Sequence, residues 1–117
     1  EFLIVDAAMN DLLRPSLYKA EHEIWNTNEG VDDKKKMNVV GPICESSDFL
    51  GKNIKINAKE GDILAVRTAG AYGFVMSSNY NSRPRACEVL VAKDQANLIR
   101  KRETLENILE MEVNTND

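Results

Sequence analysis

Short apolar runs and alternating apolar and polar positions divide the chain into many short strands. A nearly continuous apolar run with β-branched residues covers residues 2–7, and its length fits a buried strand better than a helix. The same reasoning predicts further strands at 17–25, 39–43, 54–58, 63–67 and 87–91. Turn-forming residues separate them at 10–15 and 59–62. The pattern therefore predicts a mainly β domain, built as a small barrel or sandwich.

Three segments depart from this strand pattern. Residues 26–37 carry almost no apolar side chains and are expected to form a mobile connection. A C-terminal helix is predicted because Asp94 can cap it and an amphipathic stripe follows at helical spacings, at Leu98, Arg102, Leu105 and Leu109. Residues 114–117 are polar and are expected to be a disordered tail.

Composition narrows the class of protein. A length of 117 residues fits one domain with one core. The net charge of −4 argues against a nucleic-acid partner, and no apolar run approaches the roughly 20 residues of a membrane helix. Two cysteines are too few for a disulfide scaffold, so the cytoplasm is the expected location. Because it begins without methionine in a predicted strand, the chain is also expected to be a piece of a longer protein.

Taken singly, the polar residues give weak chemical signals. His22 has no metal-ligand partners at a suitable spacing, so no metal site is predicted. Cys44 has no histidine nearby and is interpreted as a buried small side chain. Asp6 and Asp48 are interpreted as turn or capping acids. A polar cluster between the predicted strands at 63–67 and 87–91 is interpreted as support for an irregular turn. It consists of Asn79, Asn81, Arg83 and Arg85.

Two aromatic motifs are more suggestive. Arg14 followed by Tyr18 suits carboxylate recognition, because a guanidinium is a planar donor fork and a phenol adds another donor. A surface arginine beside a half-buried tyrosine is the alternative. Tyr72 lies between Gly70 and Gly73, where a sharp turn is predicted that either has φ above zero or approaches a ligand closely.

Four motifs in series extend beyond the fold class: VDAAMNDLLRPSLY at 5–18, CESSD at 44–48, AGAYG at 69–73 and SNYNSRPR at 78–85. In this order and spacing they resemble diaminopimelate decarboxylases, over almost the whole chain. That family joins a (β/α)₈ domain, which binds pyridoxal phosphate through a Schiff-base lysine, to a β-barrel like the C-terminal domain of alanine racemase. The resemblance is to the second part only. It implies a Greek-key-like β-barrel over residues 1–113, with short helical turns and one C-terminal helix.

The resemblance also implies an activity for the complete enzyme. The family removes CO₂ from the D-centre of meso-diaminopimelate to give L-lysine, with pyridoxal phosphate as the electron sink. The lysines of this chain lie in predicted loops, surface faces and the helix, so the cofactor-bearing lysine is expected elsewhere. The chain is therefore expected to be inactive alone and to work with an N-terminal (β/α)₈ domain of the same polypeptide.

The family pattern assigns roles to individual residues. Arg14 and Tyr18 are expected to bind a substrate carboxylate. Cys44 and Glu45 are expected to reach across a homodimer into the neighbouring active site. There Glu45 would read the distal ammonium, and Cys44 would be a candidate proton donor. Tyr72 is expected to contact the substrate and to face the cofactor near its phosphate.

Two other functions stay open from the sequence. The chain could be the same domain of a carboxynorspermidine or basic amino-acid decarboxylase, or a non-catalytic module that binds a decarboxylase subunit. The Cys44–Glu45 and Arg14–Tyr18 pairs favour diaminopimelate, because they suit a substrate with a second charged head. Retention of substrate-contacting residues counts against a pure binding module.

Overall fold

The computed structural model describes residues 1–28 and 33–113. They divide into two compact units, the first ending at Ser77 and the second beginning at Ser78. The predicted tail at 114–117 lies outside the described residues, as does part of the predicted connection at 26–37. No helix in the described part of the chain is both long and apolar enough to cross a membrane.

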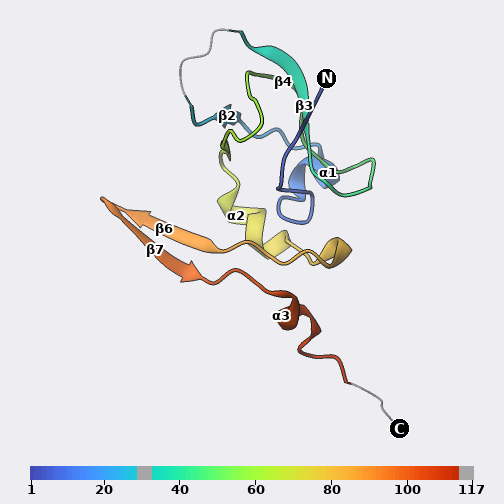
Figure 1. Ribbon diagram of the computed structural model, residues 1–117, viewed down its shortest axis with the longest axis vertical. Helices are drawn as coiled ribbons and strands as arrows, with labels where there is room; N and C mark the ends of the chain where they lie inside the picture. The colour runs from blue at the N-terminus through green and yellow to red at the C-terminus, as the bar shows by residue number, and fades with distance from the viewer. Residues whose placement is uncertain (29–32, 114–117) are drawn as a thin grey trace. The chain divides into compact units, whose positions relative to one another are not determined.

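Two small sheets build the first unit (Figure 1). In the larger sheet, β3 (Lys35–Val40) is central; it pairs in parallel with β1 (Phe2–Ile4) and antiparallel with β4 (Phe49–Ile56). In the other sheet, β2 (Ile24–Asn26) pairs antiparallel with β5 (Leu64–Val66). The predicted mobile connection is therefore wrong at its C-terminal end, where Lys35 already pairs with Ile56.

The core of the first unit lies between these sheets. Its buried members come from the turn before α1 and from strands β2, β3 and β4: Leu12, Ile24, Val39, Leu50 and Ile56. Each such side chain contributes roughly 1.5–3 kcal/mol when it leaves water. Lys52 and Lys55 of β4 are both exposed although they are three residues apart, because the positive φ of Asn53 (55°) between them interrupts the regular alternation of the strand. The core thus holds the loops at the ends of these strands in fixed positions.

The predicted strand at 17–25 is wrong over most of its length. Residues Arg14–Tyr18 form the short helix α1, which carries Pro15 in its first turn and ends at Lys19 with φ 55°. Proline suits a first helical turn, because its φ is already helical and its missing N–H is not needed there. His22 lies outside any strand, buried, with Nδ1 3.1 Å from the Arg67 carbonyl oxygen.

The glycine-flanked tyrosine lies in a short helix rather than in a turn with positive φ. Residues Gly70–Gly73 form α2, which is kinked at Tyr72 (φ −125°, ψ 20°) and continues into the 3₁₀ helix η1 (Phe74–Met76). Neither glycine of this helix has a positive φ, so that alternative of the prediction is wrong, and the close approach to a ligand stays a prediction. The change of chain direction uses Thr68 instead, whose φ is 53°.

The second unit contains a hairpin and a short helix (Figure 1). Strands β6 (Glu88–Ala92) and β7 (Gln95–Arg100) pair antiparallel around a turn in which Lys93 has φ 55°. A 3₁₀ turn, η2, covers Tyr80–Ser82. The helix α3 is confined to Leu105–Leu109 and is capped by Thr104, whose hydroxyl accepts from the Asn107 backbone N–H.

The predicted helix from Asp94 onward is therefore wrong over its first half. Leu98 belongs to β7, and Asp94 belongs to the hairpin turn. The tight turn places β7 beside β6, so its backbone groups pair between strands instead of along a helix. Leu98 and Leu105 are 60% and 57% exposed, so they form no packed stripe among the described residues.

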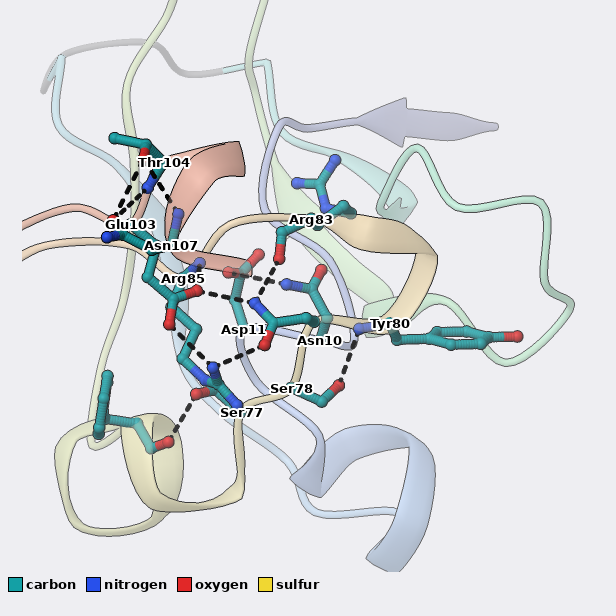
Figure 2. A network of polar contacts seen from close by, with 12 residues as sticks. Asn10, Asp11, Ser77, Ser78, Tyr80, Arg83, Arg85, Glu103, Thr104 and Asn107 are labelled. Atoms are coloured by element: carbon teal, nitrogen blue, oxygen red, sulfur yellow. Dashed lines mark hydrogen bonds and ion pairs between the residues drawn. The ribbon is translucent and has the colours of Figure 1, made fainter. Parts of the chain in front are cut away.

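A polar network stabilises the second unit (Figure 2). The Glu103 carboxylate accepts hydrogen bonds from Asn79 Nδ2 (2.7 Å), the Arg85 backbone N–H (2.8 Å) and Arg85 Nη1 (2.9 Å). The Arg85 backbone hydrogen bond, then that of Asn79, lowers the pKa of Glu103 below its usual value. This geometry agrees with the interpretation of the Asn79 to Arg85 cluster as structural support.

Replacing Glu103 by Gln is expected to remove part of the acid sensitivity of this unit. A lowered native pKa stabilises the fold above the unfolded pKa of 4.5, and this contribution is lost as the pH falls through the native value. Glu103→Gln should cost about 1 kcal/mol at neutral pH and less at pH values below the native pKa. Urea unfolding of the full-length protein, at pH values above and below the native pKa of Glu103, measures this change in the free energy of unfolding. An equal loss at every pH would contradict the prediction.

Candidate functional site

Helices α1 and α2 bring two of the predicted site residues into contact. The Arg14 guanidinium carbon lies 5.9 Å from the centroid of the Tyr72 ring, within the range of a cation–π interaction. Arg14 is half-buried at the start of α1, while the Tyr72 side chain is 58% exposed. The ring therefore orients the guanidinium, and the tyrosine hydroxyl stays available to other groups.

Tyr18 lies at the other end of α1. Arg14 and Tyr18 are four residues apart in a helix, a spacing that places their side chains on neighbouring surface positions. Tyr18 is 63% exposed. Arg14 thus lies next to Tyr72 in space and one helical turn from Tyr18, so one guanidinium and two phenols can serve an anionic group.

The CESSD motif forms a tight turn before β4. The Glu45 backbone N–H donates to the Ile43 carbonyl at 2.8 Å, and the Asp48 N–H donates to the Glu45 carbonyl at 3.0 Å. Glu45 Oε1 accepts from the Ser47 hydroxyl at 3.0 Å and from the Ser47 backbone N–H at 3.3 Å. The Glu45 carboxylate is therefore held against its own turn by the two hydrogen bonds from Ser47.

Cys44 occupies the outer part of this turn. Its thiol is free and the residue is exposed, so the interpretation as a buried small side chain is wrong. The neighbouring Ile43 is the buried residue here, and β3 has already ended at Val40, so Cys44 lies exposed in the turn that follows. An exposed thiol can meet a group outside this unit.

One contact ties α1, and another ties the residues before it, to the turn that carries Cys44 and Glu45. Ser16 Oγ donates to the Ser47 carbonyl oxygen. Asp48 accepts from the Met9 backbone N–H at 2.7 Å and from the Ile43 backbone N–H at 2.8 Å. Asp48 was expected to be a local turn or capping acid, yet Met9 is 39 residues away in sequence. Nothing in its local sequence signals that long-range contact.

The charged side chains of the described residues do not form a metal centre. Within 1–28 and 33–113, no group of three or more His, Cys, Asp or Glu residues could hold an ion. His22 uses Nδ1 on the Arg67 carbonyl, just before the segment that leads to α2. This contact fixes the backbone near Tyr72 and does not present a ligand set.

Known proteins are similar to this chain in sequence and in fold. The diaminopimelate decarboxylase of Neisseria meningitidis serogroup A is 57% identical over 109 residues, which is 90% of this chain and 26% of that protein. The crystal structure of AQ1208 from Aquifex aeolicus is 53% identical and superimposes with a TM-score of 0.91, over 93% of this chain and 27% of that one. The mainly β fold with short helices is thereby confirmed.

A third relative carries a ligand. The crystal structure of diaminopimelate decarboxylase from Helicobacter pylori, complexed with L-lysine, is 46% identical with a TM-score of 0.87. It matches 94% of this chain, which covers 27% of that one. This chain thus spans about a quarter of the length of the relatives it matches.

A family model extends over most of the first unit. The model for the C-terminal sheet domain of pyridoxal-dependent decarboxylases matches residues 1–70, more than half of the chain. This segment contains the two complete motifs with Arg14 and Glu45, and it ends at Gly70, the first residue of α2, before Tyr72. The matched sequence, together with the shared fold, shows that this chain belongs to the C-terminal sheet domain family of pyridoxal-dependent decarboxylases.

Proposed function

We propose that residues 1–113 are the C-terminal domain of a diaminopimelate decarboxylase, an enzyme that converts meso-2,6-diaminopimelate to L-lysine and CO₂ in the cytoplasm. The observation that carries the proposal is the Arg14 guanidinium placed over Tyr72. The names of the relatives from Neisseria meningitidis and Helicobacter pylori, at 57% and 46% identity, support the same substrate. The domain would act with an upstream (β/α)₈ domain that carries the cofactor-binding lysine.

Arg14 and Tyr18 would receive one carboxylate of the substrate. A guanidinium donates two parallel hydrogen bonds to a carboxylate, and the Tyr18 hydroxyl adds a third. The Tyr72 ring keeps the Arg14 fork from rotating freely, which lowers the entropy lost on binding. This holds one end of the substrate while the other end reacts.

The exposed Tyr72 hydroxyl fits one contact to a phosphate of pyridoxal phosphate, beside the positive charge of Arg14. The remaining phosphate ligands would have to come from the upstream domain. When bound, pyridoxal phosphate supplies an electron sink for the carbanion left by CO₂ loss. This chain would contribute orientation and charge.

Cys44 and Glu45 would serve the neighbouring subunit of a homodimer. The exposure of Cys44 supports this, because a buried thiol could not reach a second subunit. Glu45 would accept hydrogen bonds from the distal ammonium of the substrate, and the Cys44 thiol would deliver a proton to the reacting carbon. The serine hydrogen bonds on Glu45 hold its carboxylate in a defined position for that task.

A comparison of the isolated chain with the full-length enzyme tests the proposal. The purified 117-residue chain, given pyridoxal phosphate and meso-diaminopimelate, is expected to release no lysine, whereas the full-length enzyme should release it. Carboxynorspermidine, lysine and ornithine serve as competing substrates, and kcat/KM should favour diaminopimelate at least about 100-fold, because a site built for two polar ends rejects substrates that lack one. Lysine release by the isolated chain, or preference for another substrate, would contradict the proposal.

A further inference from the structure

We propose that His22 is a positioning residue for Tyr72: it holds the backbone turn that leads into α2, and so directs the Tyr72 hydroxyl toward the phosphate of pyridoxal phosphate. The inference rests on the proposed function, because that function assigns the phosphate contact to Tyr72. His22 is 5% exposed, and its Nδ1 lies 3.1 Å from the Arg67 carbonyl oxygen, 45 residues along the chain. A carbonyl oxygen only accepts, so Nδ1 carries the proton and donates it.

The Arg67 carbonyl lies where β5 has ended and a strained turn begins. The Arg67 N–H donates to the Glu23 carbonyl at 2.9 Å, one residue beyond the pair of Ile24 with Val66. Thr68 follows with φ 53°, which is strained for a β-branched residue. Its hydroxyl donates to the same Arg67 carbonyl at 2.8 Å. Two side-chain donors, from His22 and Thr68, therefore hold one carbonyl oxygen at the start of the turn.

This turn connects the two helices that carry the proposed site residues. Ala69, at the N-terminal end of α2, packs against the core, and Tyr72 follows three residues later. Before His22, the Ala20 N–H donates to the Arg14 carbonyl at 3.3 Å, which ties this segment to the start of α1. His22 thus joins the segment after Arg14 to the segment before Tyr72. Both residues belong to one chain and to one proposed site, where the guanidinium carbon lies 5.9 Å from the centroid of the ring.

The imidazole is poorly suited to a purely stabilising role. Within residues 1–28 and 33–113, His22 Nε2 is buried and has no hydrogen-bond partner. A buried acceptor without a donor destabilises a fold, whereas the Arg67 carbonyl would keep its Thr68 donor if the imidazole were removed. An apolar side chain would fill the same space without the unpaired nitrogen. What the imidazole alone contributes is the Nδ1–H bond to the turn.

His22→Asn and His22→Leu in the full-length enzyme are the direct test. Asparagine Nδ2, like histidine Nδ1, is two bonds from Cβ and can donate to the same carbonyl, whereas leucine fills the space without a donor. We expect the Kd of the apoenzyme for pyridoxal phosphate to rise about tenfold in His22→Leu, as for one weakened hydrogen bond to a charged group, and to stay within about threefold in His22→Asn. A packing role predicts the reverse order, because leucine suits a buried position better than asparagine. Absorbance titration of the apoenzyme measures this Kd without turnover.

Two further comparisons show whether the effect passes through the Tyr72 hydroxyl to the phosphate. Pyridoxal lacks the phosphate, so its Kd should change less than about twofold in His22→Leu. Tyr72→Phe keeps the ring beside Arg14 but removes the hydroxyl, and it should itself weaken binding of pyridoxal phosphate. In the Tyr72→Phe background, His22→Leu should change the Kd for pyridoxal phosphate by less than about twofold, because the two residues act on the same contact.

Asn26→Ala is the matched control. Asn26 ends β2, and its Nδ2 donates to the distant Asn57 carbonyl at 3.0 Å and to Asp62 at 2.7 Å. These contacts lead to none of the proposed site residues, so Tm should fall while the Kd for pyridoxal phosphate stays within about twofold of wild type. Thr68→Val removes the other side-chain donor to the Arg67 carbonyl from an exposed position and should raise the Kd about threefold. It keeps the inference testable if a His22 variant does not fold.

The outcomes are distinguishable. A raised Kd in His22→Leu that is absent in His22→Asn, for pyridoxal and in the Tyr72→Phe background supports the inference. The inference is overturned by an unchanged Kd in His22→Leu and Thr68→Val, by weaker binding in His22→Asn than in His22→Leu, or by an equal rise for pyridoxal or in Asn26→Ala. A Tyr72→Phe enzyme that binds pyridoxal phosphate like wild type also overturns it. A wild-type enzyme that binds pyridoxal phosphate but does not decarboxylate diaminopimelate overturns the proposed substrate, and the His22 comparison still reads the positioning of Tyr72.

Discussion

Arg14→Ala in the full-length enzyme is expected to lower kcat/KM for meso-diaminopimelate about 100-fold, the loss that accompanies removal of one partner from a charged, hydrogen-bonded pair. The guanidinium is positioned over the Tyr72 ring, and an alanine at residue 14 supplies neither its charge nor its planar fork. Arg14→Lys keeps the charge but not the fork, and should recover only part of the loss. Steady-state decarboxylation kinetics measure all three proteins.

Arg67→Ala is the control for this prediction. Arg67 forms an exposed ion pair with Glu23 at 3.4 Å, with side-chain exposures of 63% and 66%. Exposed pairs of this kind contribute little free energy, so kcat/KM should stay within about twofold of wild type. An Arg14→Ala enzyme with normal kcat/KM would remove Arg14 from the substrate site. A loss of the same size in both variants would point to a nonspecific effect of removing surface charge.

Glu45→Ala is expected to have the second largest effect, a fall of about 30-fold in kcat/KM, because the distal ammonium loses a charge-assisted partner. The loss should be specific for one end of the substrate. An analogue of diaminopimelate without the distal amino group should be decarboxylated slowly by the wild type and be affected by Glu45→Ala less than about threefold. The ratio of the two kcat/KM values is the informative quantity.

Glu60→Ala provides the matched surface variant, because Glu60 is an exposed carboxylate in the turn before β5. It should leave the discrimination between the two substrates unchanged. If Glu45→Ala lowered kcat/KM for both substrates by the same factor, Glu45 would not read the distal ammonium. Heterodimers in which one subunit carries Cys44→Ala can be assayed with the same two substrates. They would show which subunit's active site Cys44 serves.

Much of the first unit could be predicted from the order of its residues. The core strands alternate or form short apolar runs, and Val39 and Ile56 are buried as those patterns indicate. The motifs with Arg14 and Glu45 are visible because they are contiguous in sequence, and both lie in the segment that the family model matches. These are local properties, which do not depend on what a segment packs against.

The errors came from segments whose local pattern fits two structures. Leu98 and Leu105 have a helical spacing, but Leu98 is also a strand position opposite Val89 in the β6–β7 hairpin. The segment around Tyr18 alternates like a strand, although Pro15 begins a helix there. Partner strands and hydrogen bonds decide such cases, and a single stretch of sequence does not contain them.

The sequence by itself thus determined a mainly β domain, its buried strand residues and the motifs that contain the proposed site residues, because these depend on side-chain type and short-range spacing. Only the tertiary structure decided that Arg14 meets Tyr72 and that Asp48 joins Met9 to Ile43. Those contacts link residues far apart in the chain. Their distances depend on how the sheets and turns pack together, and this information is absent from any one segment.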